Sequence, residues 1–226
     1  MGRVKSFRLR RGRTIGDYSI RERLGRGWEG EVYRVREKYS QSERVLKLFD
    51  YKAGYRFSRV SRFCRKYERL TGVNGVIRFH HGGWSVDHRA HYIVMEYVPG
   101  KTLERFPPRG GVPVFRALRI VRDILRVVDA CHARQCRVGD IAPENIIIGS
   151  DDRPYIIDLD FGKTLTRSAA VDDVAAVCKL FYFLTKGRGA IPADLRRALP
   201  KKANVVAARY KNAKQALAAL HQLTGI

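Results

Sequence analysis

The hydrophobic and polar positions of this chain follow two different patterns in its two halves. Between residues 18 and 50, short apolar groups stand among charged and turn-forming residues, which is typical of β-strands. Val45, Leu46 and Leu48 form the densest of these groups. Residues 56–70 fit a helix, and residues 92–98 form a short apolar strand before Pro99 and Gly100. The first half is therefore predicted to be rich in strands.

After the proline- and glycine-rich stretch 107–113 the spacing becomes helical. Val114, Leu118, Val121, Leu125 and Val128 recur at intervals of three and four residues, up to about Arg134. Two short β-rich runs follow at residues 145–148 and 155–159, and two further helices are predicted at 171–184 and 212–223. We expect a boundary between a strand-rich part and a helix-rich part within residues 99–113.

Composition restricts the partners more than the fold. The 226 residues are 45% apolar, which is enough for one domain or two small lobes. Lys and Arg total 45 against 22 acidic residues, a formal charge of +23, so anions are the expected partners: nucleotides, phosphorylated substrates, nucleic acid or acidic membrane surfaces. Residues 1–17 are predicted to form a basic N-terminal arm, either mobile or bound to the surface, with a solvated terminal strand as the alternative.

The cysteines and the hydropathy pattern suggest a protein of the reducing cytoplasm. Cys64, Cys131, Cys136 and Cys178 form neither a C-x-x-C pair nor a metal-ligand cluster with the histidines, so we interpret them as buried, reduced thiols. No apolar run reaches the ~18 residues of a membrane span, and no apolar stretch follows the arginine-rich start. We therefore expect no membrane span and no secretory signal.

A glycine-rich segment is the first candidate for phosphate chemistry. Gly25, Gly27, Gly30 and Val32 fit the pattern G-x-G-x-x-G-x-V, in which missing side chains let the backbone approach phosphates closely. A dinucleotide-binding Rossmann turn is the competing interpretation, with Asp50 at a suitable distance for a ribose contact. Residues 31–44 fit a hairpin or a helix, so the local pattern leaves both open.

Three downstream motifs complete a constellation. Lys47 lies within an otherwise apolar strand, where a cation costs desolvation energy unless it meets anions. Asp140 and Asn145 match D-x-x-x-x-N, and Asp160 opens an Asp-Phe-Gly sequence twenty positions after Asp140. Taken in this order with the glycine-rich segment, the motifs resemble those of protein kinases over roughly residues 18–223, closest to a minimal bacterial-type Ser/Thr protein kinase.

This resemblance implies a fold, a division into lobes and a set of roles. The fold would be α+β and bilobal, with a small antiparallel β-rich N-lobe at residues 18–98 and a mainly helical, shortened C-lobe at residues 99–226. ATP and Mg²⁺ would be the cofactors. The helix that begins near Asp173 would anchor the catalytic loop through that aspartate, and residues 209–217 resemble the ending common in bacterial Ser/Thr kinases.

The implied site residues fall into three groups. The catalytic group is Asp140, which would accept or orient the acceptor hydroxyl, and Lys47, which would orient the phosphates with Glu68 as its brace. The metal ligands would be Asn145 and Asp160. The nucleotide would contact Gly25, Gly27, Gly30, Val32, Lys47, Met95 as gatekeeper, and the backbone of Glu96 and Val98.

Departures from the family pattern bear on the acceptor. Val138 and Gly139 replace the usual His-Arg before the aspartate, and Ala142 replaces a lysine that touches the γ-phosphate. Only ten residues separate the Asp-Phe-Gly sequence from Asp173, so most peptide-docking elements are absent. The resemblance implies a Ser/Thr protein kinase. A small-molecule kinase of the aminoglycoside or choline type, or a nucleotide-binding pseudokinase, stays open, as do an accessory protein that completes the C-lobe and binding of nucleic acid through the basic charge.

Overall fold

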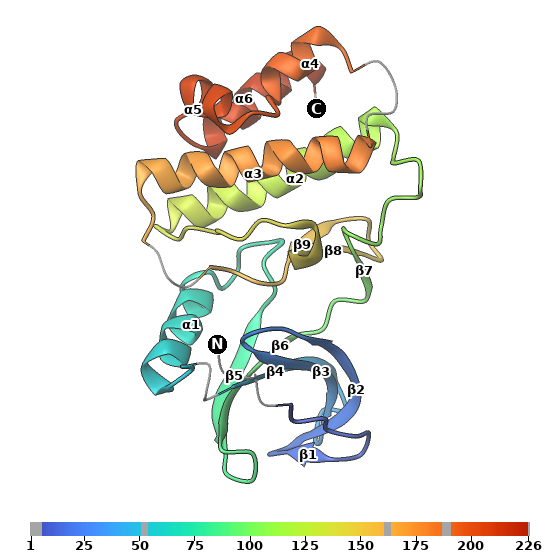
Figure 1. Cartoon of the computed structure of the whole chain (residues 1–226), viewed down its shortest axis with the longest axis vertical. Coiled ribbons are helices and arrows are strands. Elements are labelled where there is room, and N and C mark those ends of the chain that lie inside the picture. The colour runs from blue at the N-terminus through green and yellow to red at the C-terminus, as the bar shows by residue number, and fades with distance from the viewer. Residues whose placement is uncertain (1–5, 51–53, 161–163, 187–190, 226) are drawn as a thin grey trace. The chain divides into compact units, whose positions relative to one another are not determined.

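The computed structural model describes residues 6–50, 54–160, 164–186 and 191–225 (Figure 1). The chain divides into two compact units, one formed by residues 1–71 and 77–97 and the other by residues 72–76 and 98–226. In the described residues the first unit carries a six-stranded sheet and the helix α1, and the second is mainly helical with a three-stranded sheet. The predicted α+β class is confirmed.

The sheet of the first unit is antiparallel, with the strand order β1-β2-β3-β4-β6-β5. Neighbours in sequence are neighbours in space except where α1 separates β4 from the last two strands, so short hairpins make most of the sheet. The elements are β1 (Thr14–Ile15), β2 (Tyr18–Arg26), β3 (Gly30–Glu37), β4 (Glu43–Phe49), α1 (Phe57–Arg69), β5 (Phe79–Ser85) and β6 (Ala90–Glu96).

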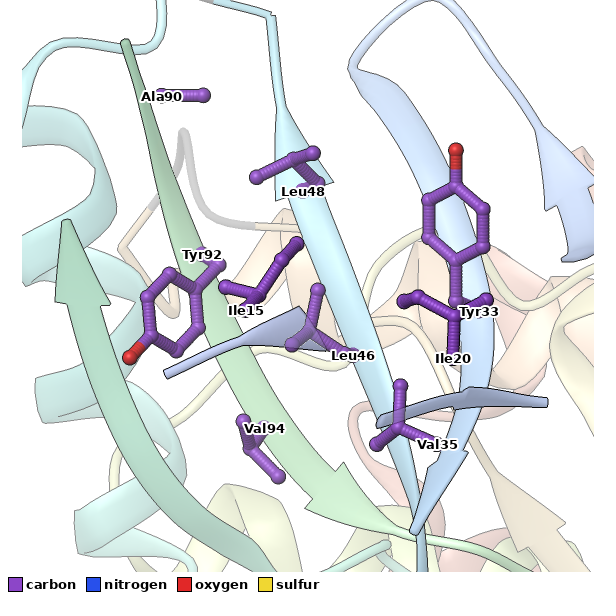
Figure 2. Packing of buried hydrophobic residues seen from close by; sticks show 9 residues of the cluster. All are labelled: Ile15, Ile20, Tyr33, Val35, Leu46, Leu48, Ala90, Tyr92 and Val94. Carbon is purple, nitrogen blue, oxygen red and sulfur yellow. The ribbon is translucent and has the colours of Figure 1, made fainter. Parts of the chain in front are cut away.

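One face of this sheet forms a hydrophobic cluster, and Figure 2 shows its side chains. Leu46 and Leu48 of β4 belong to the cluster and are fully buried. Because side chains alternate along a strand, the intervening Lys47 and the following Phe49 point to the opposite face. There the ring of Phe49 lies 5.1 Å from the ring of Phe63 on α1. The cluster consists of Ile15, Ile20, Tyr33, Val35, Leu46, Leu48, Ala90, Tyr92 and Val94.

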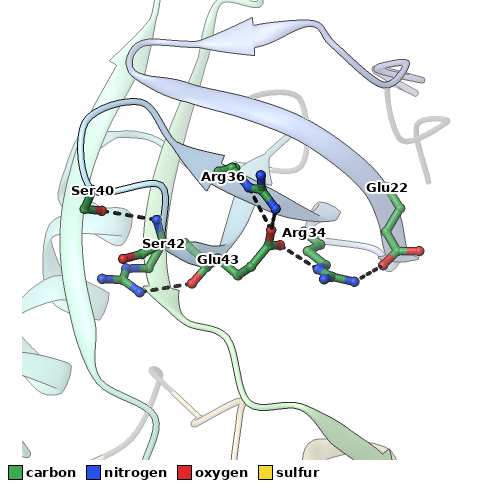
Figure 3. A network of polar contacts seen from close by, with 7 residues as sticks. Glu22, Arg34, Arg36, Ser40, Ser42 and Glu43 are labelled. Atoms are coloured by element: carbon green, nitrogen blue, oxygen red, sulfur yellow. Dashed lines mark hydrogen bonds and ion pairs between the residues drawn. The ribbon is translucent and has the colours of Figure 1, made fainter.

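Cross-strand ion pairs neutralise part of the positive charge of this unit (Figure 3). Arg36 and Glu43 are directly opposite each other in the register of β3 and β4, and their side chains meet at 2.9 Å. Arg34 donates from Nε to the same carboxylate at 2.6 Å and from Nη1 to Glu22 of β2 at 3.1 Å. This network ties three strands together through their side chains.

The second unit is built around two long helices. α2 (Val114–Ala133) packs against α3 (Arg167–Thr185) and against α6 (Ala213–Thr224), and α3 also contacts α5 (Ala203–Arg209). The predicted spacing of α2 is confirmed, since Leu118, Val121, Leu125 and Val128 are all buried. The remaining elements are β7 (Gly100–Thr102), a 3-10 turn (Pro143–Asn145), β8 (Ile146–Gly149), β9 (Pro154–Ile156) and α4 (Ala193–Ala198).

Capping side chains explain where two helices begin. The hydroxyl of Thr166 accepts a hydrogen bond from the Ala169 amide at 3.1 Å, so α3 begins at Arg167, earlier than the predicted 171. The side chain of Asn212 accepts from the Gln215 amide at 3.1 Å and sets the start of α6. The capping residues lie in the sequence, but apolar periodicity alone does not reveal them.

The structure adds elements that the sequence pattern missed. β5 is formed by a polar, glycine-containing segment that pairs with β6, and the helices α4 and α5 are short. The β-rich run predicted at 155–159 yields only the three-residue strand β9. In the part of the chain that the structure describes, no helix is both long enough and apolar enough to span a membrane.

The end of α2 gives a stability prediction. Gln135 follows the C-cap with φ +56°, while its amide donates to the His132 carbonyl at 2.9 Å and the Cys136 amide donates to the Cys131 carbonyl at 3.0 Å. This is the Schellman arrangement, whose left-handed residue is usually glycine. Because Gln135 is exposed, Gln135→Gly is expected to raise the free energy of unfolding by about 1 kcal/mol, measured by urea denaturation.

The matched control is Gln135→Ala, which removes the same side chain but keeps a Cβ. It is expected to bring no gain, because the left-handed conformation costs alanine about as much as glutamine. A glycine variant less stable than the alanine variant would contradict the assignment.

Candidate active site

The glycine-rich segment forms the hairpin between β2 and β3. Gly25 lies in β2, Gly30 opens β3, and the Gly27 amide donates to the Gly30 carbonyl at 2.9 Å. A Cβ on Gly30 would lie 1.9 Å from the Leu48 carbonyl oxygen, so this glycine is required for the close packing of β3 on β4. Cβ atoms on Gly25 and Gly27 would meet nothing within 4 Å. These two positions are open around the turn.

This hairpin decides between the two interpretations of the glycine pattern. A dinucleotide-binding turn leads from a strand into a helix and a parallel sheet. Here the residues after Gly30 form β3, antiparallel to both β2 and β4. The Rossmann interpretation is therefore wrong, and Asp50 directly follows β4.

Lys47 is a nearly buried cation with a carboxylate partner from the glycine-rich turn. Its side chain is 8% exposed and forms an ion pair with Glu29, which also accepts a hydrogen bond from the hydroxyl of Tyr55. The Lys47 ammonium lies 5.6 Å from the Phe49 ring centre and 5.5 Å from that of Phe63, within cation–π range. The Glu29 carboxylate and the faces of Phe49 and Phe63 thus help to offset the desolvation expected for a lysine in this strand.

Glu68, the residue predicted to brace Lys47, lies near the end of α1 and is exposed. The buried residues of α1 are Val60, Phe63 and Tyr67. The ion pair described for Lys47 thus comes from a neighbouring hairpin and not from the helix. The role of Glu68 stays a prediction.

A second glutamate of the hairpin is fully buried and binds the N-terminal segment. Glu31 accepts hydrogen bonds from the Ser6 hydroxyl at 3.0 Å, from the Arg8 amide at 3.1 Å and from the Tyr33 hydroxyl. Phe7 and Leu9 pack against the hydrophobic cluster. Residues 6–9 are therefore held on the surface of the first unit next to the glycine-rich hairpin, one of the two states expected for the arm.

The surroundings of Glu31 keep it charged. Burial raises the pKa of this carboxyl, but the hydrogen bonds from Tyr33, Ser6 and Arg8, with the guanidinium of Arg23 nearby, lower the pKa by more. The pKa of Glu31 is therefore below its ordinary value. The stabilisation that follows is present above the ordinary glutamate pKa and is lost as the pH falls through the lowered value.

The predicted hinge residues lie at the end of β6 and just beyond it. Met95 is 4% exposed and pairs with Val45 of β4, and its role as gatekeeper stays a prediction. The Glu96 amide donates to the Arg78 carbonyl at 2.8 Å, so this amide is already bound within the first unit. Val98 belongs to the second unit and is buried.

In the second unit, Asp140 and Asn145 are brought together. The Nδ2 atom of Asn145 donates to the Asp140 carbonyl oxygen at 3.0 Å and to its Oδ2 at 2.9 Å. Asp140 is exposed and has φ +33°, an unusual backbone conformation for a residue with a side chain. Its carboxylate is thus oriented by a neighbour while it faces solvent.

Asp173 fixes the loop that carries this pair. Its carboxylate is 2% exposed and accepts hydrogen bonds from the Val138 and Gly139 amides, each at 2.9 Å. The ring Nε2 of His132 lies 2.9 Å from the same carboxylate. The predicted anchoring by Asp173 of the loop that carries Asp140 is confirmed, because both amides directly before Asp140 are bound.

Asp160 lies against this loop. Its amide donates to the Val138 carbonyl at 2.9 Å, and a Cβ on Gly139 would come within 2.3 Å of the Asp160 Cβ. Gly139 also has φ +61°. The departure from the family pattern at this position is therefore structural: the loop approaches Asp160 so closely that only glycine fits. Phe161 and Gly162 lie outside the described residues.

Asn145 and Asp160 flank the same end of the antiparallel pair β8 and β9. Asn145 directly precedes β8 and Asp160 follows β9, and these strands are antiparallel with Ile146 opposite Ile156. The start of one strand and the end of the other therefore meet. In the described residues no cluster of three or more His, Cys, Asp or Glu suits a metal ion. A cation held here would need further oxygen atoms from a nucleotide and water, as Mg²⁺ commonly does.

Three side chains that make polar contacts in and around this candidate site were not predicted from the sequence. Glu29 and Glu31 occupy variable positions of the glycine pattern, and His132 lies in a helix whose apolar spacing says nothing about polar contacts. One signal in the sequence could have indicated the two glutamates. Acidic residues are half as frequent as basic ones in this chain, yet two of them stand close together in the glycine-rich segment. Their partners depend on the folded turn.

Comparison with known proteins gives a consistent result. Residues 18–183 match the family model described as protein kinase domain. The serine/threonine-protein kinase PknE of Mycobacterium tuberculosis is 30% identical over 178 residues, which cover 76% of this chain and 31% of that protein. PknH of Mycobacterium bovis is 29% identical over 162 residues, which cover 69% of this chain and 26% of the relative. The chain spans less than a third of the length of these relatives.

A solved structure shows the same fold. The crystal structure of the Mycobacterium tuberculosis PknI kinase domain superimposes with a TM-score of 0.67 at 21% sequence identity. The match covers 95% of this chain and 98% of that one.

Substitution of Gly139 tests the geometry of the loop. Gly139→Ala is expected to lower the free energy of unfolding by more than the ~1–2 kcal/mol of left-handed strain, because the new Cβ must also push Asp160 away. Gly72→Ala is the matched control, since Gly72 has φ +81° with nothing within 4 Å of its Cβ position. Equal losses in urea denaturation of the two variants would show that the contact with Asp160 is not tight.

Proposed function

This chain belongs to the protein kinase domain family, and from that premise we propose that it transfers the γ-phosphate of ATP to serine or threonine hydroxyls of a protein. The observation that carries the proposal is the loop in which Asn145 orients Asp140 while Asp173 holds the two preceding amides. Phosphate transfer needs little more from a protein than positioning and electrostatic stabilisation. A loop fixed at three points supplies the positioning.

Asp140 is the group proposed to act on the acceptor. One of its carboxylate oxygens, Oδ2, accepts from Asn145, which leaves Oδ1 to receive the proton of the acceptor hydroxyl. Its exposure lets an acceptor approach from solvent. The contact with Asn145 limits rotation of the carboxylate, so the hydroxyl would be held in one orientation.

The nucleotide side of the proposal rests on the first unit. Lys47 is proposed to hold the α- and β-phosphates, and the backbone around Gly25, Gly27 and Gly30 to cover them. Val32, which pairs with Lys47 in register, and Met95 would line the space for the base. The Glu96 carbonyl and the Val98 backbone would supply its polar contacts.

Asp160 and Asn145 are proposed to hold Mg²⁺. Both offer oxygen atoms: the Asp160 carboxylate, and the amide oxygen of Asn145, whose nitrogen already donates to Asp140. Two protein ligands with nucleotide oxygens and water suit this ion. When bound, Mg²⁺ neutralises negative charge on the phosphates during transfer.

The proposed acceptor class is supported by the named relatives, which are serine/threonine-protein kinases. Ala142 lacks the amino group that usually touches the γ-phosphate, so we expect slow transfer. Three further expectations stay predictions. They are an accessory protein that completes the second unit, binding of an anionic surface or nucleic acid through the net charge of +23, and a cytoplasmic location.

A transfer assay with γ-labelled ATP tests the function. Wild type is expected to label a generic basic protein or itself, and Asp140→Asn to lower the rate by about two to four orders of magnitude, because the proton acceptor is lost. Asp160→Asn is expected to abolish the Mg²⁺-dependent thermal shift by ATP, whereas Asp140→Asn keeps it.

Two outcomes of this assay would count against the proposal. Label that appears only in small molecules of a cell extract would show a small-molecule kinase. A wild-type protein with no thermal shift by ATP and magnesium would show that the nucleotide site does not work.

The ion pair between Lys47 and Glu29 generates a prediction on nucleotide affinity. Glu29 neutralises the lysine that the phosphates need and would repel them, so Glu29→Gln is expected to tighten ATP binding about three- to tenfold. Glu22→Gln is the matched control and is expected to change the affinity little, because Glu22 is exposed and pairs with Arg34. Calorimetry measures the affinity for ATP. Weaker binding by Glu29→Gln would contradict the prediction and show that Glu29 orients Lys47 for the phosphates.

A further inference from the structure

Arg137 lies among three carboxylates beside the catalytic loop. Its guanidinium nitrogens are 3.5 Å from Oδ2 of Asp160, 3.7 Å from Oδ1 of Asp173 and 4.0 Å from Oδ2 of Asp172. The side chain is only 13% exposed, whereas that of Asp172 is 63% exposed. Solvent therefore screens the pair with Asp172 most and the other two pairs less.

Hydrogen bonding at Nε does not account for the buried position of the Arg137 side chain. Its Nε is buried and has no hydrogen-bond partner in the described part of the chain. A buried donor left without a partner costs free energy, and a buried guanidinium costs more unless carboxylates compensate it. The compensation here is electrostatic, so the charge of Arg137 and the charge of its neighbours depend on each other.

Asp173 has other partners besides this cation. It already accepts from the Val138 and Gly139 amides and lies at hydrogen-bond distance from His132. Asp160 is different, because it is proposed to hold the metal ion and its Oδ2 is the atom nearest to Arg137. The missing side chain at Gly139 allows this approach, since a Cβ there would lie 3.1 Å from the same Oδ2.

A cation beside a metal-binding carboxylate has two opposite effects. It fixes the orientation of the carboxylate, which favours a productive site. It also offsets the negative charge that attracts the metal ion, which weakens binding of that ion. A residue that only stabilised the fold would leave the metal affinity of the folded protein unchanged.

We propose that Arg137 is a positioning residue for Asp160, which orients this carboxylate and at the same time lowers the affinity of the site for a divalent cation. The inference rests on the proposed role of Asp160 as a metal ligand. It deepens that role, because it makes the metal affinity of the protein depend on a residue outside the four motifs.

Binding of Mn²⁺ in the presence of ADP tests the proposal without any phosphate transfer. Electron paramagnetic resonance of free Mn²⁺ gives the affinity directly. Arg137→Gln is expected to bind Mn²⁺ about three- to tenfold more tightly than wild type, because the competing charge is gone. Arg134→Gln is the matched control: it removes one positive charge from an exposed position three residues away and is expected to bind like wild type.

Arg137→Lys keeps the proposal testable if the glutamine variant does not fold. Lysine retains the charge but not the planar fork, so its Mn²⁺ affinity is expected to stay near that of wild type while its kcat falls. An Arg137→Gln protein that binds Mn²⁺ no more tightly than Arg134→Gln would overturn the proposal. So would an Arg137→Lys protein with wild-type kcat.

The two proposals fail in different ways. If wild type with ADP binds Mn²⁺ and Asp160→Asn binds it equally well, the assignment of Asp160 as a metal ligand is wrong, and the role of Arg137 is lost with it. If Asp160→Asn abolishes binding but Arg137→Gln does not tighten it, the metal site stands and only the inference on Arg137 is overturned.

Discussion

The buried carboxylate of Asp173 is the interaction on which the candidate active site depends. It lies on α3, but it binds the two amides that precede Asp140 and the ring of His132 on α2. A carboxylate that is 2% exposed is stable only when hydrogen bonds replace its water, and here amides and an imidazole do so. Two helices and the catalytic loop are therefore joined at one charged group.

Several features of the loop follow from this anchor. The amides of Val138 and Gly139 both point at Asp173, and the chain then turns through residues with φ +61° and φ +33°. Such conformations persist only where the surroundings determine them. The same turn brings Gly139 against Asp160, which excludes any larger residue at that position. An arginine at that position would require Asp160 to shift, and Arg137 is a basic residue that lies near Asp160.

The sequence revealed the parts of the fold that depend on local pattern. The α2 spacing and the strand that carries Lys47 were predictable because periodicity encodes them, and motif order placed Asp140 and Asn145 in one loop. The hydrogen bond between these two side chains was not predicted. The partner of Lys47 was not, since Glu29 reaches it only through the closed conformation of a hairpin turn. The short helices α4 and α5 and the polar strand β5 were missed because they are too short, or too polar, to give a periodic signal.

The central claim is that Asp173 holds the loop from which Asp140 acts. The rate of phosphate transfer in a single turnover, compared between Asp173→Asn and Asp172→Asn, tests it most directly. The variants remove the same charge from adjacent positions of α3, but only Asp173 accepts hydrogen bonds from the Val138 and Gly139 amides, whereas the exposed Asp172 makes a solvent-screened pair with Arg137 at 4.0 Å. The account predicts a loss of about two orders of magnitude or more for Asp173→Asn and little change for Asp172→Asn. Equal rates in the two variants would contradict it.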